Sequence, residues 1–575
     1  MLKLISDDKT YSLLNKDPTT GFEKANNRII KRLADLNLID KVMKHRLTAN
    51  NSICPRIYGL PKAHKPELPL RPVVPNITAP SYNLSKFIGK IIQNSIKSSY
   101  NIMNSFEFCD FIGTMTLPED YILISLDVVS LFTCIPKDLV LHDIIYNWDD
   151  IRDNANNINL DLFLEIVEFC FDCSFFRFDN KFYKQIFGTA MGNPLSPILA
   201  DLVMEGLLKN VVPSLDFTLP FINKYVDDLI TAIPPSKLDY VVEKFNSYNQ
   251  HIQFTCEKEM NRKIPFLDML LTRQEDQTII TSWYQKPIAS GRFLDYLSIH
   301  PLHQKINVAK NFISRVDRLS PKVDEKTKIE LMDSHLKLNN YPVSLRHRLI
   351  NSRKCKKTVD LIETEQCKYK SISYIPGLTD KIGKFLKTDY SSIKLATKTI
   401  SKIKQIFTKV KDPVHQDDFS NVVYSIPCND CDSQYIGMTT NTLKERIGGH
   451  KSNKKALDKL RSEGVDKEDP RMANLNGQTA LLHHSIKHDH SFDLNGTRII
   501  DRHNFTSGLQ TLEMCHIARN GNTVNKKTDT EGLSVIYAGI FNSIKNKPKH
   551  TNTHNNTPNI QNTTNTQNTT NISSG

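Results

Sequence analysis

The spacing of apolar and polar residues changes several times along the 575 residues of the chain. Between residues 120 and 275, runs rich in β-branched residues, such as YILISLD and INKYVDDLITAI, alternate with segments such as PLSPILADLVMEGLL, which have a helical pattern. Alternation of strand-type and helix-type segments predicts an α+β fold. From residue 300 to about 345 the pattern is that of charged helices.

The first 119 residues mix helical stretches with closely spaced prolines. This spacing excludes a long helix in the proline-rich part and favours short strands and loops. Near the other end, residues 419–545 carry their own strand and helix signals, so we expect a second compact domain there. The closely spaced prolines of the first 119 residues are Pro55, Pro61, Pro66, Pro69, Pro72, Pro75 and Pro80.

The charge of the chain predicts an acidic partner. The formal net charge is +13, and nucleic acid is the commonest partner of such basic proteins. Residues 381–411 contain nine lysines against a single acid, Asp389, so we expect this stretch near phosphates or well solvated. Residues 551–575 hold 16 Thr or Asn and no Lys, Arg, Asp or Glu, which predicts a disordered tail.

Three features of the sequence bear on its compartment. No apolar run reaches the ~18 to 20 residues that a membrane helix needs. The first residues, MLKLISDDKTY, lack the apolar core of a signal peptide. Eleven cysteines in such a chain indicate reduced thiols. We therefore expect an intracellular protein that is neither secreted nor embedded in a membrane.

Two acidic clusters stand at the ends of strand-type runs. Asp127 ends ILISLD, while Asp227 and Asp228 end KYVDD. A buried strand that ends in a carboxylate needs a cation to offset the desolvation of that charge. Two such strands side by side would hold two divalent metal ions ~3.5 to 4 Å apart, which activate a 3′-hydroxyl and stabilise leaving pyrophosphate. An isolated Asp-Asp is more often an ordinary turn, so the surrounding residues decide.

The surrounding residues favour the metal site. Before Asp127, the segments PKAHKP and RPVV supply Lys62, Lys65 and Arg71 for the oxygens of a triphosphate. Between the two acidic clusters, GTAMGNPLSP forms a Gly/Pro-rich loop that enters a helix and suits close backbone approach by a base pair. Each of these features alone is common, and their order along the chain is the specific signal.

In this order, RPVV, LDVVSLF, MGNPLSP, YVDD and IPFLDMLL resemble the fingers and palm motifs of reverse transcriptases. PRIYGLPKAHKP, the AMG of GTAMGNPLSP and FLDYLSIHPLHQK are similar to the Penelope-like elements, retrotransposons related to telomerase reverse transcriptase. Most other reverse transcriptases have Gln at the position of Met191, so Met191-Gly192 separates this group from them. The resemblance covers residues 10 to about 540 and implies a right-hand polymerase with fingers, palm and helical thumb.

The resemblance also implies which residues hold the metal ions and the nucleotide. Asp127 and Asp227 would be the metal ligands, and Asp228 would lie beside the primer terminus. Arg71 and Lys62 would neutralise the incoming triphosphate.

Further residues of the same motifs would shape the substrate site. Phe132 would be the steric gate whose ring excludes a ribose 2′-hydroxyl, and Gly192 would shape the template-nucleotide pocket. Phe266 and Leu267 match the turn that grips the primer, although packing in the core explains them equally well.

A second group of reactive residues lies near the C-terminus, in VVYSIPCNDCDSQYIGMTTNTLKERIGGHKS. Two strands with Tyr424 and Tyr435 flank a short loop, and the following helix carries Arg446 and His450 on one face. Glu513 stands in a later helical run, QTLEMCHIA. Hydrolysis of a phosphodiester needs a base, a cation and a metal ion, and Tyr, Arg and Glu can supply these functions.

Tyr-X-Gly, preceded by a strand Tyr and followed by Arg-X3-His, resembles the GIY-YIG endonucleases, a domain that Penelope-like elements carry after their polymerase. The resemblance implies that Tyr424 and Tyr435 flank the reacting water. Arg446 would stabilise the phosphorane, and His450 would assist proton transfer or contact phosphate. Glu513 would hold one Mg²⁺ or Mn²⁺.

This chain departs from the motif in one place, since Val422-Val423-Tyr424 stands where the name has Gly-Ile-Tyr. Only the tyrosine has a chemical function, and Penelope-like members often lack that glycine. Asn525 is a weaker candidate for the polar residue that follows the metal ligand.

Cys428 and Cys431 lie between the two tyrosines. Two thiolates at this spacing can bind Zn²⁺ from a turn, but they need two more ligands. Among the nearby histidines the best pair is His484 and His490, with His483 and His488 as alternatives. The resemblance implies a structural zinc site in these places, with the ligands Cys428, Cys431, His484 and His490.

Two further expectations concern the surroundings of this site. The stretch between Arg446 and His484 has the pattern of a polar insertion with little apolar surface, which a zinc site would tie to the first hairpin. Cys170 and Cys173 have the same spacing as the zinc pair but no His or Cys nearby, so we expect them in the core.

The patterns and the resemblance together predict six segments. They are the fingers (1–119), the palm (120–275), the thumb (276–345), a basic connector (346–418), the GIY-YIG endonuclease (419–545) and a disordered Thr/Asn-rich tail (546–575). Family members usually have a further N-terminal region, so we expect an N-terminally truncated copy or an incomplete gene model.

The implied function is an RNA-directed DNA polymerase coupled to a DNA-nicking endonuclease, acting in target-primed retrotransposition. Its partners would be an RNA template, a DNA target and primer, and dNTPs. Its cofactors would be Mg²⁺ or Mn²⁺ and a structural Zn²⁺. Access to chromosomal DNA implies a nuclear location. Two alternatives are a telomerase-like polymerase without transposition activity and a catalytically inactive, RNA-binding remnant of a mobile element.

Overall fold

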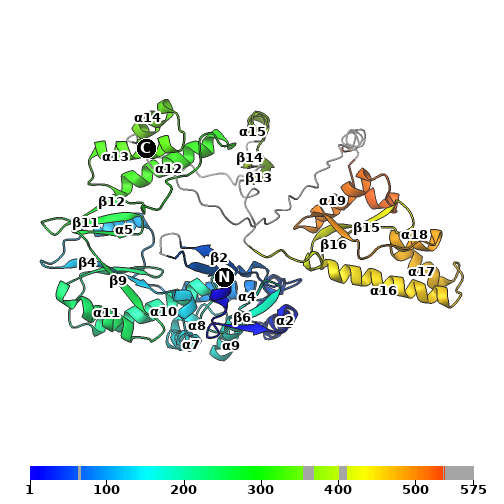
Figure 1. Ribbon diagram of the computed structural model, residues 1–575, viewed down its shortest axis with the longest axis horizontal. Helices are drawn as coiled ribbons and strands as arrows, with labels where there is room; N and C mark the ends of the chain where they lie inside the picture. The colour runs from blue at the N-terminus through cyan, green and yellow to red at the C-terminus, as the bar shows by residue number, and fades with distance from the viewer. Residues whose placement is uncertain (63–66, 354–367, 391, 400–410, 535–536, 538–575) are drawn as a thin grey trace, which may run out of the picture. The chain divides into compact units, whose positions relative to one another are not determined.

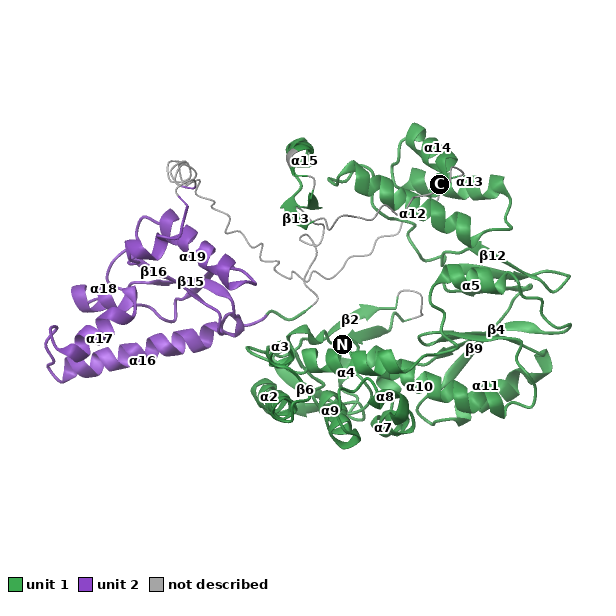
Figure 2. Ribbon diagram, turned by 180° about the vertical axis from the view of Figure 1, so that it is seen from behind, with its two compact units in different colours: residues 1–413 green, residues 414–575 purple. Residues whose placement is uncertain are grey.

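The computed structural model describes residues 1–62, 67–353, 368–390, 392–399, 411–534 and 537. The chain forms two compact units, residues 1–413 and 414–575, which are coloured separately in Figure 2. Both units combine helices with strands (Figure 1), so the expected mixture of α and β structure is confirmed. Within the described ranges, no helix has both the length and the apolar surface required to cross a bilayer.

A four-stranded antiparallel sheet organises the first unit, with strand order β7-β8-β4-β9. The central strands β4 and β8 are short apolar runs and are largely buried, as such runs favour. The strands are β4 (Ile122–Val128), β7 (Ile222–Tyr225), β8 (Asp228–Ile233) and β9 (Phe254–Lys258).

Successive side chains of β4 point to opposite faces of this sheet. Ile124 and Leu126 pack in the cluster formed with the helices, whereas Leu123 packs on the other face with Ile230. The alternation therefore places Asp127 on the face of Leu123, away from these helices. In Figure 1 the helices lie below the sheet; they are α4 (Tyr82–Ser95), α7 (Lys137–Tyr146), α8 (Trp148–Arg152), α9 (Leu160–Asp172), α10 (Ser196–Val211) and α11 (Leu238–Ser247).

The proline-rich part of the chain forms short strands and turns, as predicted. β2 (Tyr58–Pro61) and β3 (Leu70–Val73) form an antiparallel pair, followed by a 3-10 turn at Asn76–Thr78. A three-stranded sheet of order β1-β6-β5 shares a small core with this region. The remaining elements are β1 (Tyr11–Leu14), β5 (Phe175–Phe178), β6 (Lys181–Gln185), α1 (Leu2–Ile5), α2 (Thr19–Asp35) and α3 (Lys41–Leu47).

The part of the first unit that follows β9 begins with a three-stranded meander, β10-β11-β12, and continues into helices. The charged helices predicted from residue 300 to about 345 are present, and they enclose a core of their own. The elements are β10 (Lys263–Phe266), β11 (Met269–Arg273), β12 (Ile279–Trp283), α12 (Leu302–Leu319), α13 (Glu325–Leu338) and α14 (Val343–Ser352), and the meander packs on α5 (Ser105–Ile112).

Part of the range expected to be a basic connector is folded. β13 (Lys368–Ser373) and β14 (Ile393–Lys398) form a parallel pair, and α15 (Leu378–Asp389) connects them. A helix is the usual connection between parallel neighbours. Several lysines of the stretch 381–411, namely Lys402, Lys404 and Lys409, and the Thr/Asn-rich end lie outside the described residues.

The second unit is built on a three-stranded antiparallel sheet of order β16-β15-β17. Along β15 the faces alternate, so that Tyr424 packs against Ile447 of α16 and Val423 packs against Leu509 of α19. The elements are β15 (Val422–Pro427), β16 (Gln434–Thr439), β17 (Arg498–Arg502), α16 (Leu443–Ser462), α17 (Pro470–Gln478), α18 (Ala480–His488) and α19 (Thr506–Arg519).

The stretch between Arg446 and His484 is richer in apolar contacts than we expected, and that expectation was wrong. The end of α16 together with α17 and α18 encloses a small separate core. Each helix contributes only one or two apolar side chains, so the sequence has a polar pattern although the fold brings these side chains together. The core residues are Leu457, Met472, Leu475, Leu482 and Ile486.

Candidate functional site

Three carboxylates gather at one end of the β7-β8-β4-β9 sheet. Asp127 pairs with Asp228 across the β4–β8 ladder, and Asp227 precedes Asp228 in the turn after β7. Directly paired residues of antiparallel strands point to the same face, so the side chains of Asp127 and Asp228 lie together. Burial, followed by the charges of Asp227 and Asp127, raises the pKa of Asp228 to about 6. A cation would relieve this repulsion.

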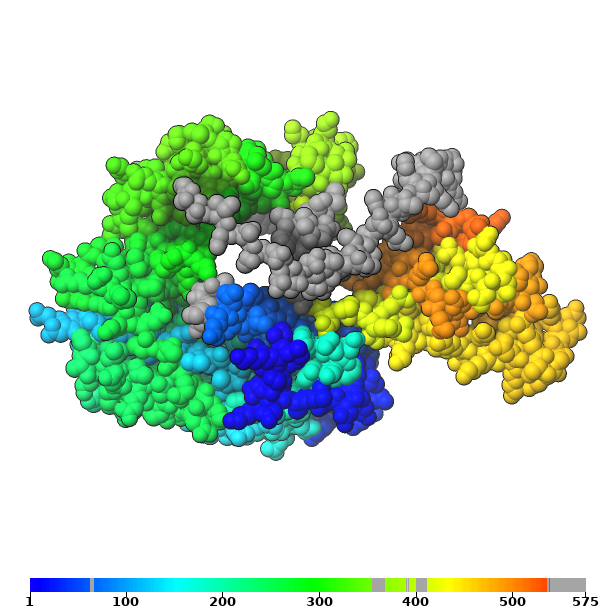
Figure 3. All heavy atoms as spheres, in the orientation of Figure 1, coloured from blue at the N-terminus to red at the C-terminus, as the bar shows by residue number. Residues whose placement is uncertain are grey.

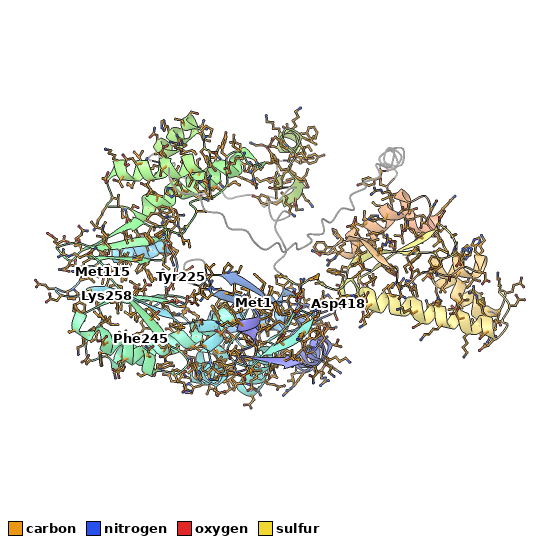
Figure 4. The ribbon with its side chains drawn as sticks, viewed as in Figure 1. Met1, Met115, Tyr225, Phe245, Lys258 and Asp418 are labelled. Carbon is orange, nitrogen blue, oxygen red and sulfur yellow. The ribbon has the colours of Figure 1, made fainter. Side chains whose placement is uncertain are left out.

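The turn that carries Asp227 has a strained backbone. Val226 has a φ of +60°, a conformation that β-branched residues rarely adopt. Pairing of Tyr225, labelled in Figure 4, with Asp228 closes the hairpin around it. The buried Lys224 forms an ion pair with Asp201 of α10, which fastens β7 to the helical layer. Such strain persists only where the surroundings hold it, and it is common at functional sites.

A cavity of about 260 Å³ opens beside the carboxylates. Both predicted metal ligands, both described cationic candidates and the predicted steric gate line it, so the structure brings these predicted site residues together. Lys65, the third cationic candidate, lies outside the described residues. The lining includes Lys62, Arg71, Asp127, Phe132, Met191 and Asp227.

The loop GTAMGNPLSP joins the wall of this cavity to β3. The amide of Val74 donates to the carbonyl of Met191 at 2.7 Å, and the amide of Asn76 donates to the carbonyl of Gly192 at 3.3 Å. Gly192 has a φ of +115°, and a Cβ atom there would lie 2.3 Å from the carbonyl oxygen of Val74. Only glycine therefore fits, and its missing side chain lets the strand that carries Arg71 approach the loop.

Phe132 lies in α6 (Leu131–Cys134), directly after Ser130, whose backbone is left-handed with a φ of +57°. The buried Thr189 holds this turn, because its amide and its hydroxyl both donate to the carbonyl of Phe132, at 2.6 and 3.0 Å. The sequence reasoning missed Thr189, Lys224 and Asp201. Thr189 could have been found from its place beside Gly188 in the loop, and Lys224 from its place in the strand-type run INKY that leads to Asp227.

Phe266 and Leu267, the primer-grip candidates, occupy the tight hairpin between β10 and β11. Phe266 is buried and its ring centroid lies 5.5 Å from that of Phe108. Leu267 is in the turn with a φ of +54° and is only partly buried. Packing in the core thus accounts for the apolar side chain of Phe266, whereas Leu267 has an unusual backbone conformation and a partly exposed side chain.

In the second unit, Tyr424 of β15 connects Arg446 and His450 of α16. The Nε atom of Arg446 donates to the hydroxyl of Tyr424 at 2.9 Å, and the same hydroxyl lies 2.9 Å from Nε2 of His450. Burial, aided by the charge of Arg446, lowers the pKa of His450 to about 4. Burial also raises the pKa of Tyr424, while the charge of Arg446 opposes that rise, so a neutral phenol lies between the guanidinium and a neutral imidazole.

The second tyrosine lies close to the first. The ring centroids of Tyr424 and Tyr435 are 6.3 Å apart. A Cβ atom on Gly437 would lie 2.8 Å from the hydroxyl of Tyr424 and 2.9 Å from that of Tyr435. The glycine of the Tyr-X-Gly pattern is therefore needed because both hydroxyls lie against its backbone.

Glu513 reaches this group from α19. Burial raises the pKa of Glu513, the carboxylate of Asp529 adds to the rise, and the charge of Arg446 opposes it. Asp529 is a residue that the sequence reasoning missed, and nothing in its local pattern marked it. The side chain of Asn525 binds the backbone of Ile436 in β16, accepting from its amide at 2.9 Å and donating to its carbonyl at 2.8 Å, and it also donates to Asp529 at 3.2 Å.

The four predicted zinc ligands also come together. Their ligand atoms all lie within 4.8 Å of one another. His484 Nε2 is 3.8 Å from the sulfur of Cys428 and 3.6 Å from that of Cys431, and His490 Nδ1 is 3.7 Å from Cys428. A tetrahedral ion with Zn–S bonds of ~2.3 Å and Zn–N bonds of ~2.0 Å places sulfur and nitrogen ligands about 3.5 Å apart. The residues therefore fit Zn²⁺.

The remaining candidates of the zinc prediction have other surroundings. His483 Nδ1 lies 2.9 Å from the amide oxygen of Asn476, so the ring of His483 is directed toward Asn476. The His488 ring is near, 4.9 Å from that of His484, but it is not part of the four-residue group. Cys170 and Cys173 are buried, and burial raises the pKa of Cys170 to about 12, so the prediction that this pair packs in the core is confirmed.

Comparisons with known proteins gave one family match and several structural similarities. Residues 292–351, which hold most of α12 to α14, match the family model of the animal helix-turn-helix domain. A search of curated proteins found no match.

The solved structures that are similar to the chain include polymerases. Telomerase from Candida albicans in complex with a TWJ fragment of telomeric RNA is 12% identical, covers 52% of this chain and 57% of its own, and has a TM-score of 0.38. Apo telomerase from Candida tropicalis is 12% identical, covers 53% and 58%, and has a TM-score of 0.35. The BmCPV RNA-dependent RNA polymerase at its elongation state is 12% identical, covers 59% and 30%, and has a TM-score of 0.29. The chain thus spans less than two thirds of each of these polymerases.

Proposed function

We propose that the first unit is an RNA-directed DNA polymerase with palm, fingers and thumb. The observation that supports this most directly is the cavity shared by Asp127, Asp227 and the cationic side chains of Lys62 and Arg71. Carboxylates bind divalent cations, and cationic side chains bind the phosphates of a triphosphate. One cavity can therefore bind both the metal ions and the nucleotide that nucleotidyl transfer requires. The resemblance of the motifs to Penelope-like reverse transcriptases points to the same reaction.

In this proposal the residues in and beside the cavity have distinct functions. Asp127 and Asp227 hold Mg²⁺ or Mn²⁺, which supplies activation of the primer 3′-hydroxyl and neutralisation of the phosphate charge. Asp228 lies beside the primer terminus, while Lys62 and Arg71 bind the triphosphate. Gly192 leaves room for the template nucleotide, and α12 to α14, which contain most of the helix-turn-helix match, serve as the thumb.

Phe132 tests the assignment of the nucleotide site. Phe132→Ala should let the polymerase accept ribonucleotides, because removing the ring opens space at the sugar 2′ position. Primer extension with matched dNTP and rNTP concentrations measures the ratio, and Phe111→Ala, a ring on α5 outside the cavity, is the control. An unchanged ratio in a Phe132→Ala protein that still extends the primer would refute the assignment.

We propose that the second unit is a DNA endonuclease of the GIY-YIG type. The supporting observation is the hydrogen-bonded chain from Arg446 through the Tyr424 hydroxyl to His450. This chain can take a proton from water through Tyr424 and pass it to the neutral His450, whose burial fits proton transfer rather than phosphate contact. Arg446 is placed to stabilise the phosphorane, with Tyr435 on the other side of the reacting water.

Glu513 completes the proposed nuclease site. It would hold one Mg²⁺ or Mn²⁺, which supplies stabilisation of the leaving oxygen when bound. Nicking of supercoiled DNA tests the site. Arg446→Ala should slow nicking roughly 100- to 1000-fold, the usual cost of losing a transition-state charge donor. Arg471→Ala, an exposed arginine of the same unit, should leave the rate unchanged. Equal losses in the two variants would remove the nuclease assignment.

We also propose that Cys428, Cys431, His484 and His490 bind one structural Zn²⁺. The site would connect the loop between β15 and β16, which supplies Cys428 and Cys431, with α18 and the residues after it, which supply His484 and His490. It would contribute folding free energy directly.

Together the two activities would serve target-primed retrotransposition, in the nucleus. The endonuclease would nick DNA, and the exposed 3′-hydroxyl would prime copying of RNA by the first unit. Incubation with supercoiled DNA, an RNA template and dNTPs separates this from the alternatives. A telomerase-like polymerase would extend a supplied primer without nicking, and an inactive remnant would do neither.

A further inference from the structure

The β13–α15–β14 segment has one covered face and one open face. Its two strands run parallel, with Tyr369 beside Lys394, Ser371 beside Ala396 and Ser373 beside Lys398. Side chains of directly paired residues in a parallel ladder point to the same face, and successive residues alternate. Each pair named here therefore lies on the same face as the others.

The helix α15 covers the other face. A Cβ atom on Gly383 of α15 would lie 3.9 Å from Leu395, which is partly buried together with Ile393 and Thr397. The alternate residues of β14, including Lys394 and Lys398, are exposed. The open face is therefore the one that carries Tyr369. Figure 3 shows the segment as yellow-green spheres.

The composition of the open face is unusual for a sheet surface. Tyr369 is 67% exposed and lies next to Lys394, and the other residues of β13 on the open face, Ser371 and Ser373, are small. The two strands carry four lysines and no acidic residue. A flat surface with one exposed ring, small side chains and positive charge offers little apolar area to a protein partner.

We propose that this open face binds single-stranded nucleic acid, with a base stacked on Tyr369 and the backbone phosphates on Lys394 and Lys398. Stacking on an exposed ring requires a base that is free of its pairing partner, which favours a single strand over a duplex. Positive charge without acidic neighbours on the strands suits the phosphate backbone. These residues belong to neither proposed active site, so this binding site goes beyond both proposed activities.

The test measures binding by the full-length protein without chemistry. The probe is a fluorescent single-stranded oligouridylate that contains 4-thiouridine, used with a chelator and without dNTPs. Ultraviolet crosslinking followed by mass spectrometry should find β13 or β14 residues joined to the probe. Tyr369→Ala should weaken binding about fivefold or more, and Tyr369→Phe should bind like the unmodified protein because the ring remains.

Matched controls come from the same segment. Phe385 is also exposed but belongs to α15, and Lys387 follows on the same helix. Phe385→Ala and Lys387→Ala should leave binding unchanged, whereas Lys394→Gln and Lys398→Gln together should weaken it and flatten its dependence on salt.

Three results would overturn the proposal: crosslinks that lie entirely outside β13 and β14, equal losses in the α15 controls, or equal weakening of duplex binding. Tyr369 is largely exposed, so its replacement should not unfold the segment, and thermal melting checks this. Because no step of the test depends on catalysis, failure of this proposal and failure of the proposed activities remain distinguishable.

Discussion

At the scale of single residues, the hydroxyl of Tyr424 connects two reactive side chains of the second unit, Arg446 and His450. It accepts from Arg446 and lies within hydrogen-bond distance of Nε2 of His450 inside a buried environment. His450 is therefore held neutral in the folded state, although an ordinary histidine takes up a proton near pH 6.5.

The lowered pKa of His450 predicts how stability depends on pH. The unfolded chain binds a proton near pH 6.5 and the folded chain only near pH 4, so the stability associated with neutral His450 is present above pH 6.5 and is lost as the pH falls toward 4. The melting temperature of the second unit, measured between about pH 7.5 and about pH 5, should fall more steeply than that of His450→Gln. His347→Gln, at an exposed position of the first unit, should leave the melting of the second unit unchanged at every pH. Parallel curves for the unmodified protein and His450→Gln would contradict the assignment.

The sequence identified many of these residues by type, but not their contacts. Aspartates at strand ends and Tyr-X-Gly before a helix are local patterns, and they pointed to Asp127, Asp227 and Tyr424. The support given by Thr189 to the Phe132 turn and by Asp201 to Lys224 depends on segments far apart in the chain, which local patterns cannot connect. Asp529 was missed for the same reason.

At the scale of elements, the loop around Gly192 joins two segments that the sequence analysis treated separately. β3, which carries Arg71, approaches the loop closely because Gly192 has no side chain. The cavity therefore depends on a backbone contact as much as on its reactive side chains.

Gly192→Ala tests this contact. The added Cβ atom would lie 2.3 Å from the carbonyl oxygen of Val74, and the φ of +115° is unfavourable for alanine. We expect a loss of about 1–3 kcal/mol in the stability of the first unit and a large loss of primer extension. Gly21→Ala, where nothing lies within 4 Å of the added atom, should preserve both. A Gly192→Ala protein with unchanged stability and extension would contradict the proposed geometry.

Zinc binding is a second prediction at this scale. Cys431→Ser should lower the metal content from about one zinc per chain and the melting temperature of the second unit by roughly 5 °C or more, because the ligand set loses a thiolate. Cys515→Ser, on α19 outside the ligand group, is the matched control. Elemental analysis and calorimetry measure both. If the unmodified protein folds and nicks DNA with no bound zinc, the four residues are only a packed cluster.

Element types were easier to predict than their partners. The two tyrosine strands, the helix with Arg446 and the helices after residue 300 all formed where their apolar spacing placed them. The pairing of Asp127 with Asp228 could not be predicted from the sequence, because packing across the whole sheet fixes the register between its strands. The βαβ fold of residues 368–398 was also missed, since its many exposed lysines hide a short apolar pattern.

At the scale of the whole molecule, the chain consists of two compact units, each with its own core and its own group of reactive side chains. Carboxylates and cationic side chains line the cavity of the first unit, whereas tyrosine, arginine and histidine form the hydrogen-bonded group of the second. Because the residue sets lie in separate cores, we predict that the two proposed reactions can be removed one at a time.

The most direct test of this account is a single assay that scores DNA nicks and cDNA together, with supercoiled DNA, an RNA template, a supplied primer and dNTPs. Asp227→Asn should abolish cDNA synthesis and leave nicking intact, and Glu513→Gln should abolish nicking and leave extension of the supplied primer intact. Glu330→Gln, an exposed carboxylate of α13, should retain both activities. Loss of both activities in either Asp227→Asn or Glu513→Gln, in protein that remains folded, would contradict the presence of two separate active sites.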